Sequence, residues 1–111
     1  MKWEVHAELV VMEDGLDSVA LTDRLAAWLS AHGADALPQL TMADGGTAET
    51  LGAVFGMPAE TPGQAADAAL TQLRRAASDL GVPVGPVDEV LVRRAHIDPR
   101  APLAERRAEG T

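Results

Sequence analysis

The sequence predicts an α+β domain in which a four-stranded antiparallel sheet carries two helices on one face. Three observations lead to this prediction. Residues 2–12 alternate between apolar and polar side chains, as a half-buried strand does. Residues 17–32 and 61–80 carry apolar side chains at helical spacing. An Asp-Gly-Gly turn at residues 44–46 separates two further strand-like stretches.

Length and composition indicate one globular domain. The chain has 111 residues, of which 47% are hydrophobic and 23% charged. We expect a single domain over residues 1–97. Residues 98–111 are rich in Pro, Ala and charges without periodicity, which predicts a disordered C-terminal tail. The chain has no cysteine, so thiolate zinc sites and cysteine nucleophiles are excluded, and we expect no cofactor.

The charge balance argues against two classes of partner. The formal net charge is −8, whereas phosphate backbones and anionic lipids are bound by clustered Lys and Arg. No apolar run approaches the roughly 18 residues that a membrane span requires, and the N-terminal stretch is too polar for a secretory signal. We therefore expect a cytoplasmic protein that binds neither nucleic acid nor membranes.

The first strand and first helix each have a distinct apolar face. In residues 2–12 the inward set is Trp3, Val5, Ala7, Leu9 and Val11, and the outward set is Lys2, Glu4, His6, Glu8 and Val10. The helix is expected to begin at an Asp17 or Ser18 cap and to end at Gly33. Its apolar stripe is Leu21, Leu25, Trp28 and Leu29.

The middle of the chain predicts a hairpin. Residues 35–43 form a weaker strand, and Pro38 places that strand at a sheet edge because proline donates no ladder hydrogen bond. The partner strand, residues 47–57, has Gly52 and Gly56 on one face. Two glycines leave a flat strip of backbone that another group can approach closely.

The second helix and last strand complete the pattern. Thr61 begins a capping box with proline at the first helical position, and Gly81 ends the helix. The predicted apolar stripe is Ala66, Leu70, Leu73, Ala77 and Leu80. In the last strand, residues 87–95, Val90 and Val92 point inward, whereas Glu89, Leu91 and Arg93 point outward.

The order strand, helix, strand, strand, helix, strand is the ferredoxin-like βαββαβ arrangement. Right-handed crossovers then give the strand order 4-1-3-2, with the first strand in the centre and the Pro38 strand at an edge.

The outward face of this sheet holds the candidate site. Glu4, His6 and Glu8 alternate onto it, with Arg93 expected across from them. Such residue types are typical of metal and acid–base sites, but also of a solvated sheet face with cross-strand charge pairs. Residues two apart on a strand are about 6.5–7 Å apart, which is wide for ligands of one ion. We therefore assign no catalytic or metal-binding residue.

Apolar residues on the same face indicate a binding surface. Val10, Val54 and Leu91 lie beside the glycine strip, and a sheet covered on one side only can bury the other against a partner. We predict self-association as a homodimer, or binding of another protein, through this face. The predicted binding residues are Glu4, His6, Glu8, Val10, Val54, Leu91 and Arg93.

Two functions remain open at this point. The first is a small interaction or ligand-binding module, a homodimeric accessory or regulatory protein without enzymatic activity. The alternative is a small cofactor-independent enzyme of the dimeric α/β-barrel type, with a pocket between sheet and helices and His6 as an acid–base residue. An enclosed pocket with convergent polar groups would favour the enzyme.

Overall fold

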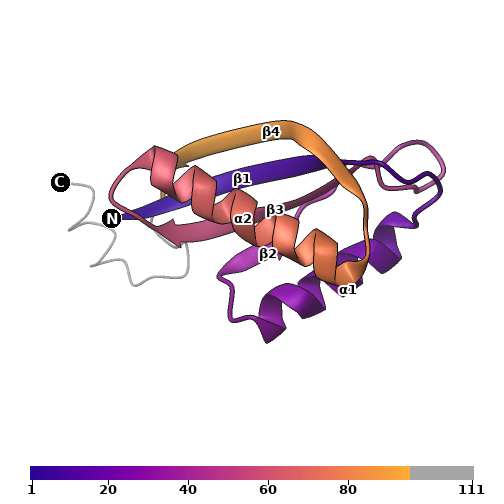
Figure 1. The fold of residues 1–111 in the computed structure, drawn as a ribbon, viewed down its shortest axis with the longest axis horizontal. Coiled ribbons are helices and arrows are strands. Elements are labelled where there is room, and N and C mark those ends of the chain that lie inside the picture. The colour runs from indigo at the N-terminus through magenta and orange to yellow at the C-terminus, as the bar shows by residue number, and fades with distance from the viewer. Residues whose placement is uncertain (96–111) are drawn as a thin grey trace, which may run out of the picture.

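A computed structural model describes residues 1–95 of the chain, and the predicted tail at 98–111 lies outside the described residues. The elements follow the order βαββαβ (Figure 1). Their bounds are β1 Lys2–Val11, α1 Ser18–Ala31, β2 Ala36–Pro38, β3 Thr50–Pro58, α2 Pro62–Leu80 and β4 Val84–Arg94.

The strands form one antiparallel sheet in the order β2-β3-β1-β4. Read from the opposite edge, this is the predicted order 4-1-3-2. The central strand β1 pairs with β3 through Val5↔Phe55 and with β4 through Val5↔Val92. The short strand β2 pairs only with β3, so β2 and β4 are the edge strands of the described sheet.

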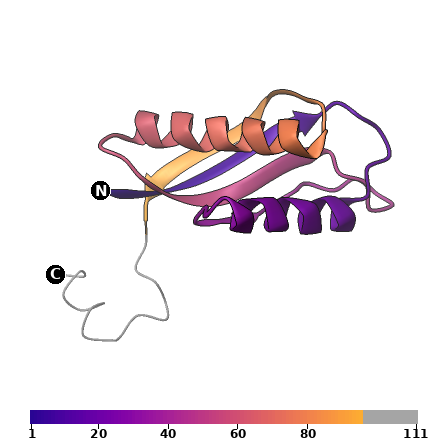
Figure 2. The ribbon, with the colours of Figure 1, turned by 60° about the horizontal axis from the view of Figure 1, so that its bottom comes forward.

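One apolar core lies between the sheet and the helices. Inward residues of β1 and β3 join the buried faces of α1 and α2 in a single cluster. Helix α2 packs across β1, β3 and β4, and α1 lies beside α2 on the β2 side (Figures 1 and 2). The largest fully buried side chains are Phe55, Leu9, Leu25, Leu29, Leu51, Leu73 and Val5. No helix within residues 1–95 is long and apolar enough to cross a membrane.

Helix α1 matches its sequence pattern closely. Asp17 is the N-cap, and its carboxylate accepts a hydrogen bond from the Ala20 amide at 2.8 Å. All four residues of the predicted stripe are buried, and Gly33 follows the helix with φ of 66°. Two bonds tie α1 to α2: the Trp28 indole donates to Asp79 at 2.8 Å, and Arg24 donates to the Leu80 carbonyl at 2.6 Å.

The prediction for β2 was too long. Residues 35–43 were expected to form a strand, but the ladder with β3 covers only Ala36–Pro38. Proline cannot donate to a ladder, and beyond Pro38 the pairing continues through single contacts such as Gln39 N to Gly52 O at 2.9 Å. The edge position and the turn at residues 44–46 are as predicted; Gly45 and Gly46 have φ of 87° and 82°.

The buried face of α2 differs from the predicted stripe. Its buried residues are Ala65, Ala69, Leu73, Ala76 and Ala77, whereas Ala66, Leu70 and Leu80 are only partly buried. The prediction centred the face on the larger side chains. In the structure a row of alanines faces the sheet, because small side chains let the helix approach the strands closely. The caps at Thr61 and Gly81 are as predicted.

Strand β4 begins earlier than predicted. It includes Val84 and Pro86, which precede the predicted start at residue 87. The register against β1 shifts at two places, between Glu8 and Leu9 and between Leu9 and Val11. Such irregularities bend a strand, and an edge strand tolerates proline because one side of its ladder is unpaired.

Candidate functional site: the open face of the sheet

The face of the sheet that points away from the helices, here called the open face, carries all the predicted binding residues. They alternate with the core residues along each strand, and the register brings them side by side. His6 pairs with Val54 of β3 and Leu91 of β4, and Glu4 pairs with Arg93. The remaining predicted residues, Glu8 and Val10, continue along β1.

One row of side chains crosses all four strands on the open face. In the order of the sheet it consists of Leu91, His6, Val54 and Leu37, and we call it the central row. Its two ends are the most exposed, since Leu91 is 49% and Leu37 73% accessible to solvent. Leu37 was missed at the sequence level. The strand pattern around Pro38 was too weak to show which side its residues face.

A second row runs beside the central row and consists of charged groups. Arg93 on β4 donates from Nε to Glu4 Oε2 on β1. Next along the row, Lys2 reaches across β3 to Asp35, with Nζ 2.6 Å from Oδ2. Asp35 lies beside β3 because the Gly56 amide donates to its carbonyl at 2.8 Å. This charged row therefore alternates in sign: Arg93 positive, Glu4 negative, Lys2 positive, Asp35 negative.

Glu4 contacts both His6 and Arg93 on the open face. His6 Nε2 lies 3.1 Å from Glu4 Oε2, and the Arg93 guanidinium contacts the same oxygen. The hydrogen bond from His6 and then that from Arg93 hold the pKa of Glu4 below its ordinary value, because both favour the ionised form. Glu4 and His6 remain about one quarter exposed, at 26% and 24%. The three groups thus form a compact, partly solvated ion-pair cluster.

Glu8 anchors the other side of the central row. Its Oε1 accepts hydrogen bonds from the Thr50 hydroxyl at 2.7 Å and the Thr41 hydroxyl at 2.8 Å. Thr50 is almost fully buried, so water cannot readily accept a hydrogen bond from its hydroxyl. The Glu8 carboxylate provides that acceptor instead. Glu8 therefore ties β1 to the β2–β3 hairpin, which is a structural role.

The glycine strip of β3 is occupied by the chain itself. A Cβ on Gly52 would lie 2.5 Å from the Gln39 carbonyl oxygen and 2.5 Å from Glu8 Cγ. On Gly56 it would lie 2.7 Å from Lys2 Cε and would also collide with the Asp35 carboxylate. The strip was expected to admit an outside group. Instead, it lets two of the chain's own charged side chains lie flat across the sheet.

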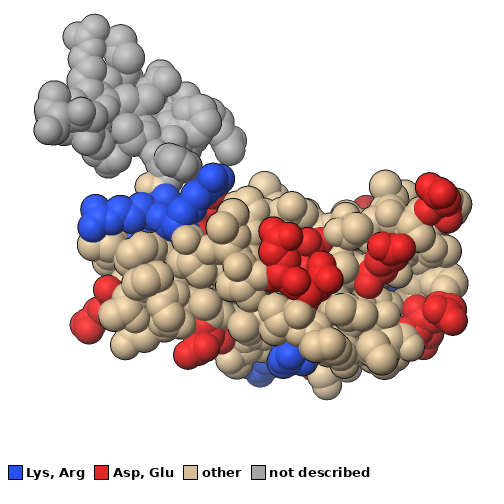
Figure 3. Space-filling view, turned by 90° about the horizontal axis from the view of Figure 1, so that it is seen from above, with Lys and Arg blue, Asp and Glu red and all other residues tan. Residues whose placement is uncertain are grey.

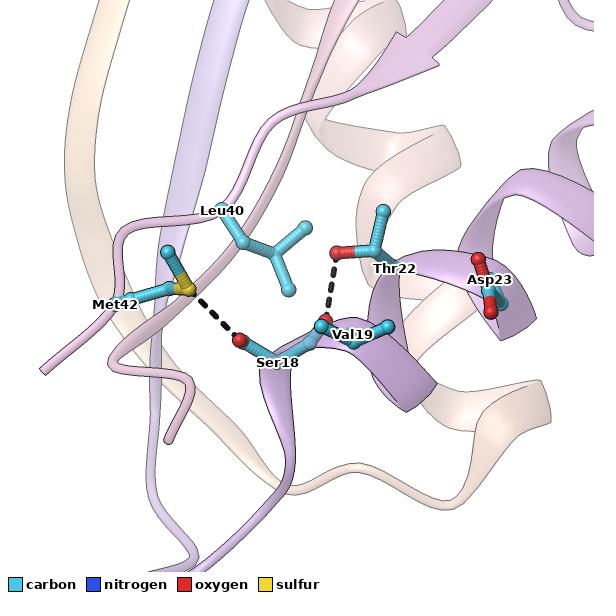
Figure 4. A pocket seen from close by; sticks show the side chains of 6 residues that line it. All are labelled: Ser18, Val19, Thr22, Asp23, Leu40 and Met42. Carbon is cyan, nitrogen blue, oxygen red and sulfur yellow. Dashed lines mark hydrogen bonds between the residues drawn. The ribbon is translucent and has the colours of Figure 1, made fainter. Parts of the chain in front are cut away.

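A separate hollow of about 280 Å³ lies between the start of α1 and the β2–β3 hairpin (Figure 4). The Ser18 hydroxyl donates to the Met42 sulfur at 2.8 Å, and the Thr22 hydroxyl donates to the Ser18 carbonyl at 2.7 Å. Both hydroxyls thus have partners within the chain, and no histidine is among the six lining residues. The geometry provides no activated nucleophile here.

Charged side chains are unevenly spread on the surface seen from the β4 edge. Basic side chains gather near the end of β4, and separate acidic groups are scattered over the rest of this view, between side chains of neither kind (Figure 3). A further hollow of about 450 Å³ is lined by Glu13, Asp14, Glu49 and Asp88 among others. Within residues 1–95, however, no three His, Cys, Asp or Glu side chains converge closely enough to hold a metal ion.

Comparison with other proteins adds no relative to this description. The chain matches no protein-family model, no curated protein and no solved structure.

Proposed function

We propose that the protein is a homodimeric interaction module, an accessory or regulatory protein of the cytoplasm, that associates through the open face of a ferredoxin-like sheet. The central row supports this proposal most strongly. It presents exposed Leu37 and Leu91 at opposite edges of the sheet with Val54 between them. The three apolar side chains of this row, which is interrupted only by His6, gain stability when a second surface removes them from water.

Two further observations favour association through the face and not through the β4 edge. Pro86 lies in β4, and the register of β4 against β1 shifts twice. Proline and bulges are common means by which proteins discourage pairing at an edge strand. The open face has no comparable interruption, and it carries charges of both signs, so it can be self-complementary.

The geometry does not favour the alternative of an enzyme with a pocket beneath the helices. His6, the proposed acid–base residue, lies on the open face, on the opposite side of the sheet from α1 and α2. The space beneath the helices is filled by core side chains such as Phe55 and Leu73, which are 1% and 0% exposed.

Sedimentation velocity tests the proposal. The wild-type chain should sediment as a dimer at micromolar concentration, and Leu91→Arg should sediment as a monomer, because it would bury a charge against apolar side chains. Val19→Arg is the matched control, since Val19 is 66% exposed on α1, away from the open face. A wild-type monomer at high micromolar concentration would refute the homodimer. Equal dimerisation of both variants would show that the open face is not the interface.

A further inference from the structure

We infer that the two copies stack their open faces about a twofold axis that runs parallel to the strands, between β1 and β3. This inference rests on the proposed homodimer and specifies its geometry. Sheets that stack in the aligned manner keep their strand directions within about 30° of each other, and in such a stack the axis runs either along the strands or across them. The two choices bring different residues together, and the charges distinguish them.

An axis along the strands reverses the order of the strands in the second copy. Each charge of the charged row then meets a charge of opposite sign. Arg93 faces Asp35 of the second copy, and Glu4 faces Lys2 of the second copy, with each contact repeated by symmetry. When a row that alternates +, −, +, − is laid against a reversed copy of itself, each positive charge lies opposite a negative one. A twofold interface requires this kind of self-complementarity.

The central row is compatible with the same axis. Reversing the strand order places Leu91 against Leu37 of the second copy and His6 against Val54 of the second copy. The hollow beside Leu37 has a volume of about 420 Å³ and offers space for the exposed Leu91 side chain. Its lining is mixed, with Val54 and Gly56 on one hand and Glu4 and Asp35 on the other. Each copy would insert its Leu91 side chain into the hollow of the other copy.

An axis across the strands is less favourable. This axis keeps the strand order in the second copy. Residues on one side of the central row then face the residues on the other side of that row in the second copy. Glu4 would then lie opposite β1 at Glu8 of the second copy, so it would face no positive charge across the interface. His6 would also face its own copy. The favourable charge contacts in that arrangement would be Arg93 opposite Glu89 and Lys2 opposite Glu8, whose carboxylate already accepts two hydrogen bonds within its own chain.

Crosslinking of introduced cysteines distinguishes the two axes, because each axis brings different positions together. The chain contains no native cysteine, so only the introduced thiols react. Leu91→Cys and Leu37→Cys, treated separately with a short bis-maleimide, should give no crosslinked dimer, whereas a mixture of the two should give one. Val19→Cys serves as a control for random collision. Sedimentation first confirms that each variant is dimeric.

Each outcome decides a different question. The inferred axis is wrong if Leu91→Cys crosslinks to itself. It is also wrong if the variants are dimeric but no mixture of them crosslinks. Either result would leave the proposed homodimer intact. A monomeric wild-type chain overturns both. In that case the open face is left to a heterologous partner or to water.

Charge reversal provides a second, independent measurement. Asp35→Arg and Arg93→Asp should each weaken dimerisation about tenfold or more, since each opposes like charges twice. Mixed together they should associate to within about threefold of the wild-type affinity, because the opposite charges face each other again. Glu89→Arg is the matched control. It should not weaken dimerisation for the inferred axis, and a loss would instead favour the axis across the strands.

Discussion

Single residues on the open face show how the backbone makes room for charge. The backbone at Gly52 has a conformation that other residues can also adopt. Glycine is required there because a Cβ atom would collide with neighbouring atoms. Glu8 lies directly above it and reaches the Thr50 hydroxyl beyond. The sequence pattern correctly placed Gly52 on this face. It could not show what lies above the glycine, because that depends on the rotamer of a residue on another strand.

Gly52→Ala should destabilise the fold by about 1–3 kcal/mol, since the new methyl group would displace both Glu8 and the Gln39 carbonyl. Gly63→Ala is the control, because a Cβ there meets only Thr61 Oγ1 at 4.0 Å. Reducing the freedom of the unfolded chain should make that variant more stable by roughly 0.4–1 kcal/mol. Urea denaturation measures both. Equal stability of the two variants would contradict the close packing at Gly52.

The ion-pair cluster around Glu4 should make stability depend on pH in the acid range. His6 and then Arg93 lower the pKa of Glu4 below its ordinary 4.5, so the unfolded chain binds a proton more readily than the folded one. The stabilising contribution is therefore complete above pH 4.5 and is lost as the pH falls through the lowered pKa.

Glu4→Gln should consequently lose less stability than the wild type on acidification below pH 4.5. Urea midpoints measured at a series of pH values give the two curves, and Glu60→Gln, an exposed carboxylate before α2, is the control. Curves for Glu4→Gln and wild type that run parallel throughout would exclude a role for Glu4.

At the scale of the elements, local patterns predicted what each segment becomes, but packing determined how it is oriented. The caps of α1 and α2 depend on nearby residues, and both are as predicted. The buried face of α2 depends on how closely the helix approaches the sheet, which periodicity alone cannot show. Apolar residues occur on several sides of α2, so the predicted stripe was only partly correct: Leu73 and Ala77 are buried as predicted, but the other three predicted residues are only partly buried.

Ala69→Leu tests this orientation of α2. Ala69 is fully buried, so the larger side chain should destabilise the fold by about 1–3 kcal/mol through overpacking. Ala68→Leu, one position along on the exposed side, should change stability by less than about 0.5 kcal/mol. Thermal or urea unfolding of the two variants provides the comparison. A tolerated Ala69→Leu would mean that the alanine face does not pack closely on the strands.

At the scale of the whole molecule, net charge opposes the association that the open face favours. Each chain carries a formal charge of −8, so two copies repel each other at long range. The ion pairs inferred across the interface act over short distances and, being partly solvated, contribute about 1 kcal/mol or less each. The long-range repulsion should therefore dominate when salt is low, because the Debye length is then about 30 Å.

Raising the ionic strength from about 10 mM to about 150 mM shortens the Debye length to about 8 Å and screens this repulsion. The dissociation constant of the dimer should then fall several-fold, although salt also weakens the contacts between Arg93 and Asp35. Sedimentation equilibrium at a series of salt concentrations measures the effect. In Asp35→Asn/Arg93→Gln the net charge is unchanged but the Arg93–Asp35 pairs are absent, so the fall should be at least as large as in the wild type. A wild-type dissociation constant that rises with salt would show that local ion pairs, and not net charge, govern the salt dependence.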